Sequence, residues 1–386
     1  MSWDSARLLA HVVGRPRAAV SRALEDAVGC VLAGPLVSPG AVPPVDRSAM
    51  DGYAVCGGGP WRVVGHVGVE CAAPLDLSAG QACSITTGAA VPAGTTSVLR
   101  DEDVALDGEW VCGPSEVGRH IRRAGEECQA GEVVLPAGVV VDGPVLGLAA
   151  SLGLNRLIVI PQPVVAVLIT GDELVHQGPS APGRVRDALG PMLPNLITRA
   201  GAGVGPIHHL PDTHAALLAA IKSSDADVVL VSGSSASGPA DHLRAVLREM
   251  GAELVVDGVA CRPGHPQALA RLADGRLVIG LPGNPLAALT AFLTLGVAAI
   301  AGLRGLTLPD LPVGAIPGGV ACHPHSTRLV PVRVTAQGVV PVGHGGSAML
   351  RGAAGADALA VVEPGPAEAV AARLLPLDPG TRPWAS

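Results

Sequence analysis

Three segments in the middle part of the chain consist almost wholly of apolar residues and end abruptly in glycine and polar residues. These segments cover residues 164–169, 227–231 and 276–280. Uninterrupted apolar runs of this length are typical of strands that are buried on both faces of a parallel sheet. Segments with helical character lie between them, at 192–200 and 240–250. This alternation of strand and helix predicts an α/β fold with a parallel sheet wrapped by helices.

The chain of 386 residues is long enough for two to four domains. Short valine-rich segments separated by glycine, proline and aspartate predict two small β-rich domains on either side of the sheet domain. In the first part of the chain, residues 21–30 are compatible with a helix, and residues 144–152 could form a helix entered by proline. The predicted domains are 1–46 together with 132–160, then 47–131, 161–308 and 309–386.

The composition is that of a globular protein, with 48% hydrophobic and 15% charged residues. A formal charge of −7 leaves no broad basic surface, so nucleic acid is not an expected partner. The eight cysteines contain no Cys-x-x-Cys pair, which favours free thiols in a reducing compartment. The first residues lack the zones of a signal peptide. We therefore expect a cytoplasmic protein.

One segment, residues 286–303, carries no charge over eighteen residues and reaches the lower limit for a membrane span. Its alanine, threonine and glycine content, and its start after Pro-Gly-Asn-Pro, favour a helix buried against the sheet. We expect no membrane association.

Ligands of open parallel sheets bind beyond the carboxyl ends of the strands, so the residues that follow each apolar segment are candidates for chemistry. The first such run is Thr170-Gly171-Asp172-Glu173. Its adjacent carboxylates could hold a divalent cation or transfer a proton. Helix capping by Asp172 is the alternative.

The second run follows the next apolar segment and is rich in small residues and hydroxyls. Such a loop exposes backbone N–H groups at a helix N-terminus and favours an anion. The third run opens the long apolar helix, and could equally be simple helix punctuation. The candidate residues in these two runs are Ser232, Gly233, Ser237, Gly238 and Asp241, then Pro282, Gly283 and Asn284.

Earlier in the chain, the run from Asp46 to Val55 contains the only tyrosine, Tyr53. Its Asp51-Gly52 pair predicts a tight turn that displays a carboxylate before a strand. Thr87 lies in a second distinctive run, Thr86-Thr87-Gly88-Ala89. Arg122 and Arg123 precede two glutamates, and these arginines either grip a phosphate or belong to a solvated charge cluster.

These runs resemble, in order, motifs of the molybdopterin molybdenumtransferases, the family of bacterial MoeA and the gephyrin E domain. The matching strings include Ser-Ala-Met-Asp-Gly-Tyr-Ala, Thr-Gly-Asp-Glu-Leu and Leu-Pro-Gly-Asn-Pro, and they span residues 20–305. The resemblance implies an elongated four-domain subunit with a MogA-like sheet domain. It also implies a homodimer in which one chain's sheet domain meets the Asp51 and Thr87 segments of the other.

The family inserts molybdate into adenylylated molybdopterin and releases AMP, with magnesium implicated. Possible partners are a MogA-like adenylyltransferase and molybdoenzyme acceptors. By resemblance, Asp172, Glu173 and Asp241 handle the cation, Arg262 and the loop after residue 231 hold oxyanions, and Asp51 and Thr87 complete the site.

The sequence departs from the family at several polar positions. The family's Lys-Pro-Gly-Lys-Pro appears as Arg262-Pro263-Gly264-His265-Pro266, and histidine, largely neutral near pH 7, attracts an oxyanion less than lysine. The family's Asp-x-Asn reads Asp187-Ala188-Leu189, and Ser234 replaces a glycine. Alternatives are therefore a weakened or inactive paralogue that binds molybdopterin or acts as a scaffold, and an enzyme for another oxyanion such as tungstate.

Several histidines could bind a metal, although scattered surface histidines are the commoner situation. These are His208, His209, His323 and His325.

Overall fold

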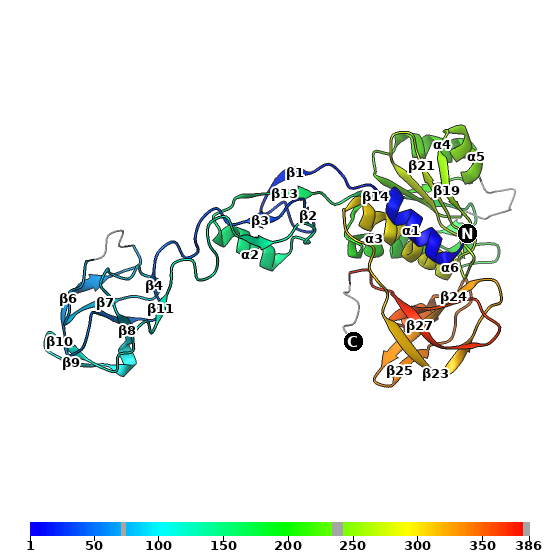
Figure 1. Cartoon of the computed structure of the whole chain (residues 1–386). Coiled ribbons are helices and arrows are strands. Elements are labelled where there is room, and N and C mark those ends of the chain that lie inside the picture. Colours follow the sequence, from blue (N-terminus) through cyan, green and yellow to red (C-terminus); the bar gives the residue numbers. More distant parts are fainter. Residues whose placement is uncertain (71–74, 234–241, 381–386) are drawn as a thin grey trace. The chain divides into compact units, whose positions relative to one another are not determined.

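The computed structural model describes residues 1–70, 75–233 and 242–380, and this part of the chain forms two compact units (Figure 1). The larger unit comprises Met1–Val20, Gly29–Val31 and Ile158–Ser386, and the smaller unit comprises Ser21–Val28 and Leu32–Leu157. The smaller unit is thus an insertion in the sequence of the larger one.

The smaller unit contains a six-stranded sheet with the order β8-β5-β7-β6-β10-β9. Its pairs are antiparallel except for β6 and β7. Trp61 is buried on this sheet and anchors one of its two small apolar clusters. The expected β-rich character of this region is confirmed. The strands are β5 (Gly52–Val55), β6 (Trp61–Val67), β7 (Gln81–Ile85), β8 (Ser97–Arg100), β9 (Ala105–Asp107) and β10 (Trp110–Cys112), with a 3-10 turn at Asp101–Asp103.

Short pairings and one helix complete this unit. Helix α2 (Gly143–Ser151) begins where Asp142 Oδ1 accepts a hydrogen bond from Val145 N at 3.1 Å, with Pro144 in its first turn, so the predicted proline-entered helix is confirmed. The paired strands are β11 (Ile121–Arg122) with β4 (Arg47–Ser48), and β12 (Val133–Leu135) with β3 (Leu36–Val37).

The helix expected over residues 21–30 is wrong. This segment starts in strand β1 (Val20–Ala23), which pairs with β13 (Arg156–Ile160) in a sheet completed by β2 (Val31–Leu32). The guanidinium of Arg156 donates to the hydroxyl and to the carbonyl of Ser21, at 2.8 and 3.0 Å. Strand pairing with a distant segment therefore outweighs the local helix propensity.

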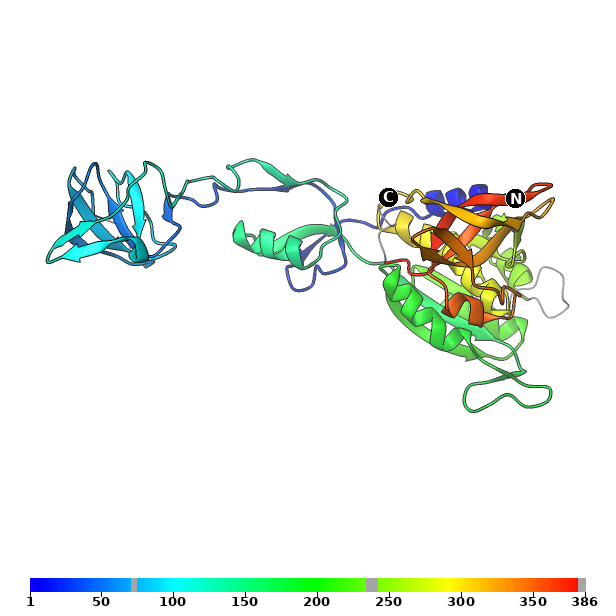
Figure 2. The same ribbon diagram turned by 90° about the horizontal axis from the view of Figure 1, so that it is seen from below.

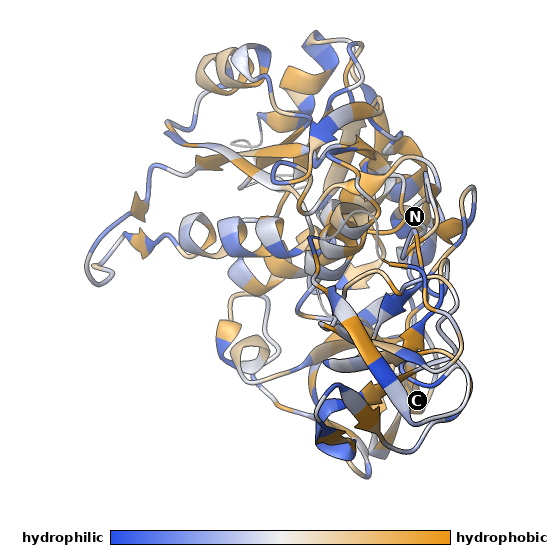
Figure 3. Cartoon of the chain, turned by 90° about the vertical axis from the view of Figure 1, so that its left-hand side faces the viewer, coloured by the Kyte–Doolittle hydropathy of each residue, from blue (hydrophilic) through white to orange (hydrophobic). Residues whose placement is uncertain are grey.

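The larger unit is built on a six-stranded sheet with the order β17-β14-β18-β22-β21-β19. The first four strands are parallel to one another. Strand β21 runs antiparallel to both of its neighbours, β22 and β19. In Figure 3 the strands carry mostly hydrophobic residues, whereas many loops are hydrophilic. The three apolar segments of the sequence form the central strands, as expected. The strands are β14 (Val164–Thr170), β17 (Gly203–Leu210), β18 (Val228–Val231), β19 (Glu253–Asp257), β21 (Ala268–Arg271) and β22 (Leu277–Gly280).

Helices cover both faces of this sheet. Alternate residues of each central strand point to opposite faces and therefore enter different apolar clusters. Leu230 joins a cluster with α1, α3 and the apolar helix, whereas Val229 joins a cluster with α4 and α5. The helices are α1 (Trp3–Val13), α3 (Leu189–Arg199), α4 (His214–Ser223) and α5 (Leu243–Glu249), with the apolar helix made of α6 (Pro285–Ala291), a π-helical turn (Phe292–Gly296) and α7 (Val297–Leu303).

The apolar helix, Pro285–Leu303, is long and apolar enough to cross a membrane, but 94% of its apolar window is buried inside the protein. Burial of this extent is typical of a core helix. The expectation of a helix packed against the sheet is confirmed.

A second sheet of the larger unit has the order β20-β24-β26-β27-β23, with β25 paired to β24. Strand β20 (Cys261–Arg262) belongs by sequence to the predicted sheet domain but pairs with β24, so the predicted C-terminal β region includes Arg262 as an added strand. The other elements are β23 (Val313–Ala321), β24 (Thr327–Thr335), β25 (Gly338–Pro341), β26 (Ala358–Val362), β27 (Glu368–Pro376) and helix α8 (Leu350–Ala354).

Helix α1 and the apolar helix pack so closely that their backbones are in contact at Gly302. A Cβ added to Gly302 would lie 2.2 Å from the carbonyl oxygen of His11 and 2.4 Å from that of Gly14. Trp3 is buried in the same contact, and its Nε1 donates to Thr294 Oγ1 at 2.9 Å. The glycines allow this packing because they carry no side chain.

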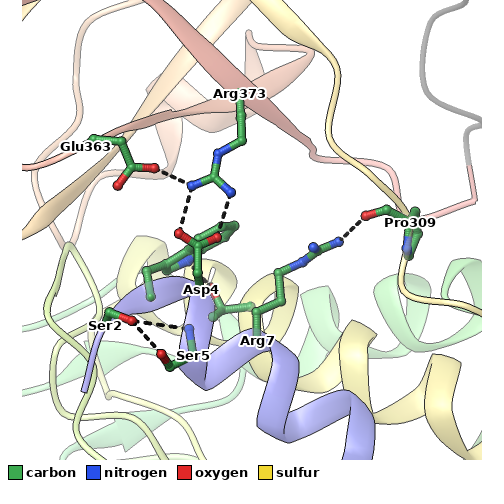
Figure 4. Close-up of polar contacts among 9 residues, drawn as sticks. Ser2, Asp4, Ser5, Arg7, Pro309, Glu363 and Arg373 are labelled. Atoms are coloured by element: carbon green, nitrogen blue, oxygen red, sulfur yellow. Dashed lines mark hydrogen bonds and ion pairs between the residues drawn. The ribbon is translucent and has the colours of Figure 1, made fainter.

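The start of α1 is held by polar contacts from the end of the chain (Figure 4). The guanidinium of Arg373 donates to both carboxylate oxygens of Asp4, at 2.6 and 2.9 Å, and also pairs with Glu363. These carboxylates raise the pKa of Arg373, chiefly through the hydrogen bonds that Arg373 donates to Asp4. Arg7 donates to the carbonyl of Pro309 at 2.9 Å.

Substituting Gly302→Ala is expected to destabilise the protein by about 1–3 kcal/mol, because the new methyl group overpacks a backbone contact. Thermal and urea unfolding of the full chain would measure the loss. Gly147→Ala is the matched control, since Gly147 lies within α2 and its added Cβ meets nothing within 4 Å. That variant should keep or slightly raise stability. Equal stability of the two variants would contradict the packing described here.

Candidate active site at the carboxyl edge of the sheet

Loops that contain polar residues and glycine follow all four parallel strands of the β17-β14-β18-β22-β21-β19 sheet. Asp212 follows β17, Asp172 follows β14, Ser232 follows β18, and Gly283 follows β22. Because parallel strands end at a common edge, these loops face the same side of the sheet. Asp241, Ser237 and Gly238 were predicted to belong here, but they lie outside the described residues.

The loops after β14 and β18 are joined by hydrogen bonds. Thr170 Oγ1 donates to the carbonyl of Ser232 at 2.8 Å, and Thr170 N donates to Ser232 Oγ at 3.0 Å. Gly233 has a φ of +79°, and an added Cβ would lie 2.6 Å from Thr170 Oγ1. A side chain at this position would break the join, so the glycine has a structural reason.

The loop after β22 abuts these two. Leu281 N donates to the carbonyl of Val231 at 2.7 Å, and a Cβ on Gly283 would lie 3.7 Å from the Cα of Gly233. Asn284 is the N-cap of α6 without a side-chain cap, and its Nδ2 donates instead to Ser347 Oγ at 3.2 Å. The Pro282–Asn284 run therefore both starts the helix and stands at the sheet edge.

Three carboxylates gather at this edge. The backbone N–H of Asp212 donates to Asp172 Oδ1 at 3.2 Å, and both oxygens of Glu173 lie 3.0 Å from the position of a Cβ on Gly171. Burial raises the pKa of Asp212, and the negative charges of Asp172 and Glu173 raise it further, against a smaller opposing effect of His242. No helix follows Asp172, so the helix-capping alternative is wrong.

The enclosed space here is small. A cavity of about 10 Å³ has room for about one water molecule. A large ligand would therefore lie across the open edge rather than inside the sheet domain. The cavity is lined by Thr170, Pro211, Asp212, Thr213, Leu217, Val231, Ser232, Gly233, His242 and Leu243.

Arg262 lies in β20 and His265 follows this strand, so neither stands at a strand end of the β17-β14-β18-β22-β21-β19 sheet. His265 Nδ1 is 2.7 Å from the carbonyl oxygen of Val259, so one ring nitrogen is used by the backbone. Arg262 is exposed. The pKa of His323 is lowered by desolvation of this histidine and further by the positive charge of Arg262. Among the described residues, no hydrogen bond or ion pair joins Arg262 or His265 to the carboxylates of the sheet edge.

In the smaller unit, Asp51 and Thr87 are brought together as the sequence suggested. Thr87 N donates to Asp51 Oδ1 at 2.7 Å, across 36 residues of sequence. Gly52 has a φ of +150°, and an added Cβ would lie 1.8 Å from the carbonyl oxygen of Leu99. The predicted turn at Asp51-Gly52 is confirmed, and it presents an exposed carboxylate before β5.

The two arginines of this unit have different surroundings. Arg123 pairs with Asp46 at 2.6 Å, and Ala124 N donates to the same carboxylate at 2.8 Å. The Ala124 hydrogen bond and Arg123 lower the pKa of Asp46. Arg122 is exposed and stands opposite Arg47 in the strand pair. Arg123 therefore contributes to a charge cluster, which was one of the two alternatives.

Comparison with known proteins assigns this chain to a family. Three family models match: the MoeA N-terminal region (domain I and II) over residues 1–153, a probable molybdopterin binding domain over 166–302, and the MoeA C-terminal region (domain IV) over 317–372. Molybdopterin molybdenumtransferase 2 of Mycobacterium tuberculosis is 36% identical over 291 residues, which cover 70% of this chain and 71% of that protein. This chain belongs to the molybdopterin molybdenumtransferase family.

Other family members agree. The molybdopterin molybdenumtransferase of Haemophilus influenzae is 35% identical over 295 residues, which cover 73% of this chain and 72% of that protein. The crystal structure of a molybdopterin biosynthesis MoeA protein from Pyrococcus horikosii matches with a TM-score of 0.79 and 26% identity, covering 98% of this chain and 99% of that chain.

Two residues at the edge were missing from the predicted molybdenumtransferase site. Asp212 follows β17 just as Asp172 follows β14, so its position after a strand was an available signal. Ser347 lies 63 residues from Asn284 in sequence, and no local pattern relates the two.

Substituting Asp212→Asn should stabilise the protein near pH 7 by about 0.5 kcal/mol, the scale of interactions between partly exposed charges. The raised pKa of Asp212 means that the folded protein prefers the protonated carboxyl. This preference stabilises the wild type fully below the ordinary value of 3.8, and the benefit is lost as the pH rises through the folded pKa. The gain from the substitution should therefore shrink toward pH 4.

Urea unfolding at pH 7 and pH 4 would measure this difference. Asp225→Asn, an exposed carboxylate in the same unit, is the matched control and should change little at either pH. A stability loss at pH 7 for the Asp212 variant would contradict the repulsion described here.

Proposed function

We propose that this protein is a molybdopterin molybdenumtransferase, which inserts molybdate into adenylylated molybdopterin and releases AMP in molybdenum cofactor biosynthesis. The observation that carries the proposal is the shared edge of the sheet, where carboxylates and tightly packed glycine loops meet. Membership of the family supplies the substrate class.

The loops after β18 and β22 provide the anion-binding part of the site. Ser232 and Gly233 lie at the start of a run of small residues that, in the sequence, includes Ser237 and Gly238, and this composition suits phosphate oxygens. Pro282, Gly283 and Asn284 stand beside this loop. Arg262 and His265 supply further donors for phosphate or molybdate.

The acidic part of the site fits a divalent cation. Asp172, Glu173 and Asp212 offer carboxylate oxygens, the ligand type that Mg²⁺ prefers. Burial, and then the negative charges of Asp172 and Glu173, raise the pKa of Asp212. Asp172, Glu173 and, by sequence, Asp241 would hold the ion. When bound, Mg²⁺ would neutralise charge on the phosphates during hydrolysis. The chain's own carboxylates position it, and one of them can accept a proton from the attacking water.

The complete site is proposed to form in a homodimer. In this arrangement Asp51 and Thr87 of the partner subunit approach the sheet edge, and the exposed Arg122 of that subunit contributes donors for phosphate. We further propose a cytoplasmic location, receipt of substrate from a MogA-like adenylyltransferase, and delivery of the cofactor to molybdoenzymes.

The proposal predicts AMP release from adenylylated molybdopterin only when molybdate is present. Glu173→Gln should lower the rate at least about 100-fold, on the scale seen when a general base or its electrostatic role is lost. Chromatographic measurement of AMP against molybdate concentration would test this. Glu249→Gln, an exposed substitution on α5, should retain wild-type activity. Absence of turnover at every molybdate concentration would contradict the proposal and favour the binding-protein alternative.

The double substitution Arg262→Lys with His265→Lys should lower the KM for molybdate about fivefold, which corresponds to about 1 kcal/mol. The reason is the added positive charge at His265, since histidine is largely neutral near pH 7. Steady-state kinetics over a molybdate series would measure the change. Arg262→Lys alone keeps the charge and serves as the control. An unchanged KM in the double variant would show that this loop does not hold molybdate.

A further inference from the structure

A second polar cluster lies beside the candidate active site and is used by none of the chemistry above. It consists of His176, Asp187 and His209, whose ligand atoms all lie within 4.8 Å of one another. Within the described ranges 1–70, 75–233 and 242–380, it is the one group of three such residues that converges in this way.

Two of the three separations between these atoms are close to those in a tetrahedral metal centre. Asp187 Oδ2 is 3.3 Å from His209 Nε2 and 3.7 Å from His176 Nδ1. Ligands at about 2.0–2.2 Å from a tetrahedral ion are separated from one another by about 3.3–3.6 Å. The two measured separations therefore need only small adjustment to coordinate a common ion.

The carboxylate is held in place for this role. Asp187 Oδ1 accepts hydrogen bonds from the backbone N–H groups of Leu189 and Gly190, at 2.9 and 3.0 Å, at the start of α3. The other oxygen, Oδ2, is the one that faces both imidazoles. The Asp187 side chain is only 5% exposed, whereas those of His176 and His209 are 45% and 41% exposed. The carboxylate is thus fixed on the protein side, and solvent reaches the histidine side.

The three residues come from separate segments. His176 directly follows β15 (Leu174–Val175), Asp187 directly follows β16 (Val185–Arg186), and His209 lies in β17, the edge strand of the sheet. The loop between β15 and β16 projects from this unit (Figure 2). An ion bound by all three residues would tie both ends of that loop to the sheet.

The neighbouring arginine side chains, Arg184 and Arg186, donate to backbone carbonyls rather than to the ligand atoms of this cluster. On the same loop, Arg184 donates to the carbonyl of Asp172, and Arg186 donates to the carbonyl of Val175 at 3.3 Å. The two imidazole rings lie with centroids 3.7 Å apart and tilted by 48°. Two rings this close would repel each other if both were protonated, whereas a metal ion uses both as neutral ligands.

We propose that His176, Asp187 and His209 bind a divalent transition-metal ion of the Zn²⁺ type. Two imidazoles and one carboxylate are a ligand set for such ions, whereas Mg²⁺ prefers oxygen ligands. Three protein ligands leave a fourth position for water or an oxyanion. The inference concerns the resting protein and does not depend on the proposed transferase activity.

The test uses Zn²⁺ and Co²⁺ as probes on the full chain after chelator treatment. A Cys112→Ser background removes an exposed thiol that could bind these ions. Calorimetry with Zn²⁺ should show one equivalent bound, and Co²⁺ should give visible absorption of a tetrahedral nitrogen and oxygen site. Excess Mg²⁺ should not displace the ion. His176→Ala and His209→Ala should each weaken binding at least about tenfold.

His208→Ala is the matched control. His208 is the exposed neighbour of His209 on the same strand, and successive strand residues point to opposite faces. Its affinity for Zn²⁺ should equal that of the wild type. Asp187→Asn keeps an oxygen for the α3 backbone but replaces the charged ligand, and should also weaken binding.

Two outcomes would overturn the proposal. One is absence of stoichiometric Zn²⁺ or Co²⁺ binding, which would leave a cluster of histidines and a carboxylate that binds only protons. The other is equal loss of affinity in the His208→Ala variant, which would place the ion elsewhere. Neither outcome bears on AMP release, so failure here is distinguishable from failure of the proposed function.

Discussion

The backbone contact between α1 and the apolar helix Pro285–Leu303 supports the candidate site. Gly302 and Trp3 fix how the two helices cross, and the apolar helix in turn begins at Asn284, inside the loop that follows β22. The hydroxyl of Thr290 in this helix is 3.2 Å from the carbonyl oxygen of Pro263, beside Arg262. A shift of the helix along its axis would therefore move two of the loops proposed to bind anions.

The sheet edge combines features that oppose stability with features that suit an anionic ligand. Burial raises the pKa of Asp212, and the charges of Asp172 and Glu173 raise it further. A bound cation would relieve the repulsion between these carboxylates. Glycines let the loops after β18 and β22 pack closely, which leaves backbone N–H groups near the same edge. A bound cation would reduce the repulsion between these carboxylates and a phosphate-bearing ligand.

Sequence reasoning was most successful where one physical effect dominates. The apolar runs of β14, β18 and β22 could form only buried strands, and the polar residues that follow them had to share an edge. The helix prediction for residues 21–30 was wrong because this segment pairs with the strand that contains Arg156. Arg156 lies 135 residues from Ser21 in the sequence, so no local pattern indicates the pairing. The His176, Asp187 and His209 cluster was equally hidden, since it depends on three separate segments of the chain meeting in space. His209 had been considered only as one scattered histidine among several.

The insertion of the smaller unit into the sequence of the larger one affects the nascent chain. Trp3 leaves the ribosome well before its partner Thr294, which is synthesised 291 residues later. At about 5–20 residues per second, the apolar side of α1 waits on the order of 15–60 s for its binding partner. The inserted unit can fold during that interval, so the larger unit is completed after it, and until then the apolar side of α1 lacks its partner.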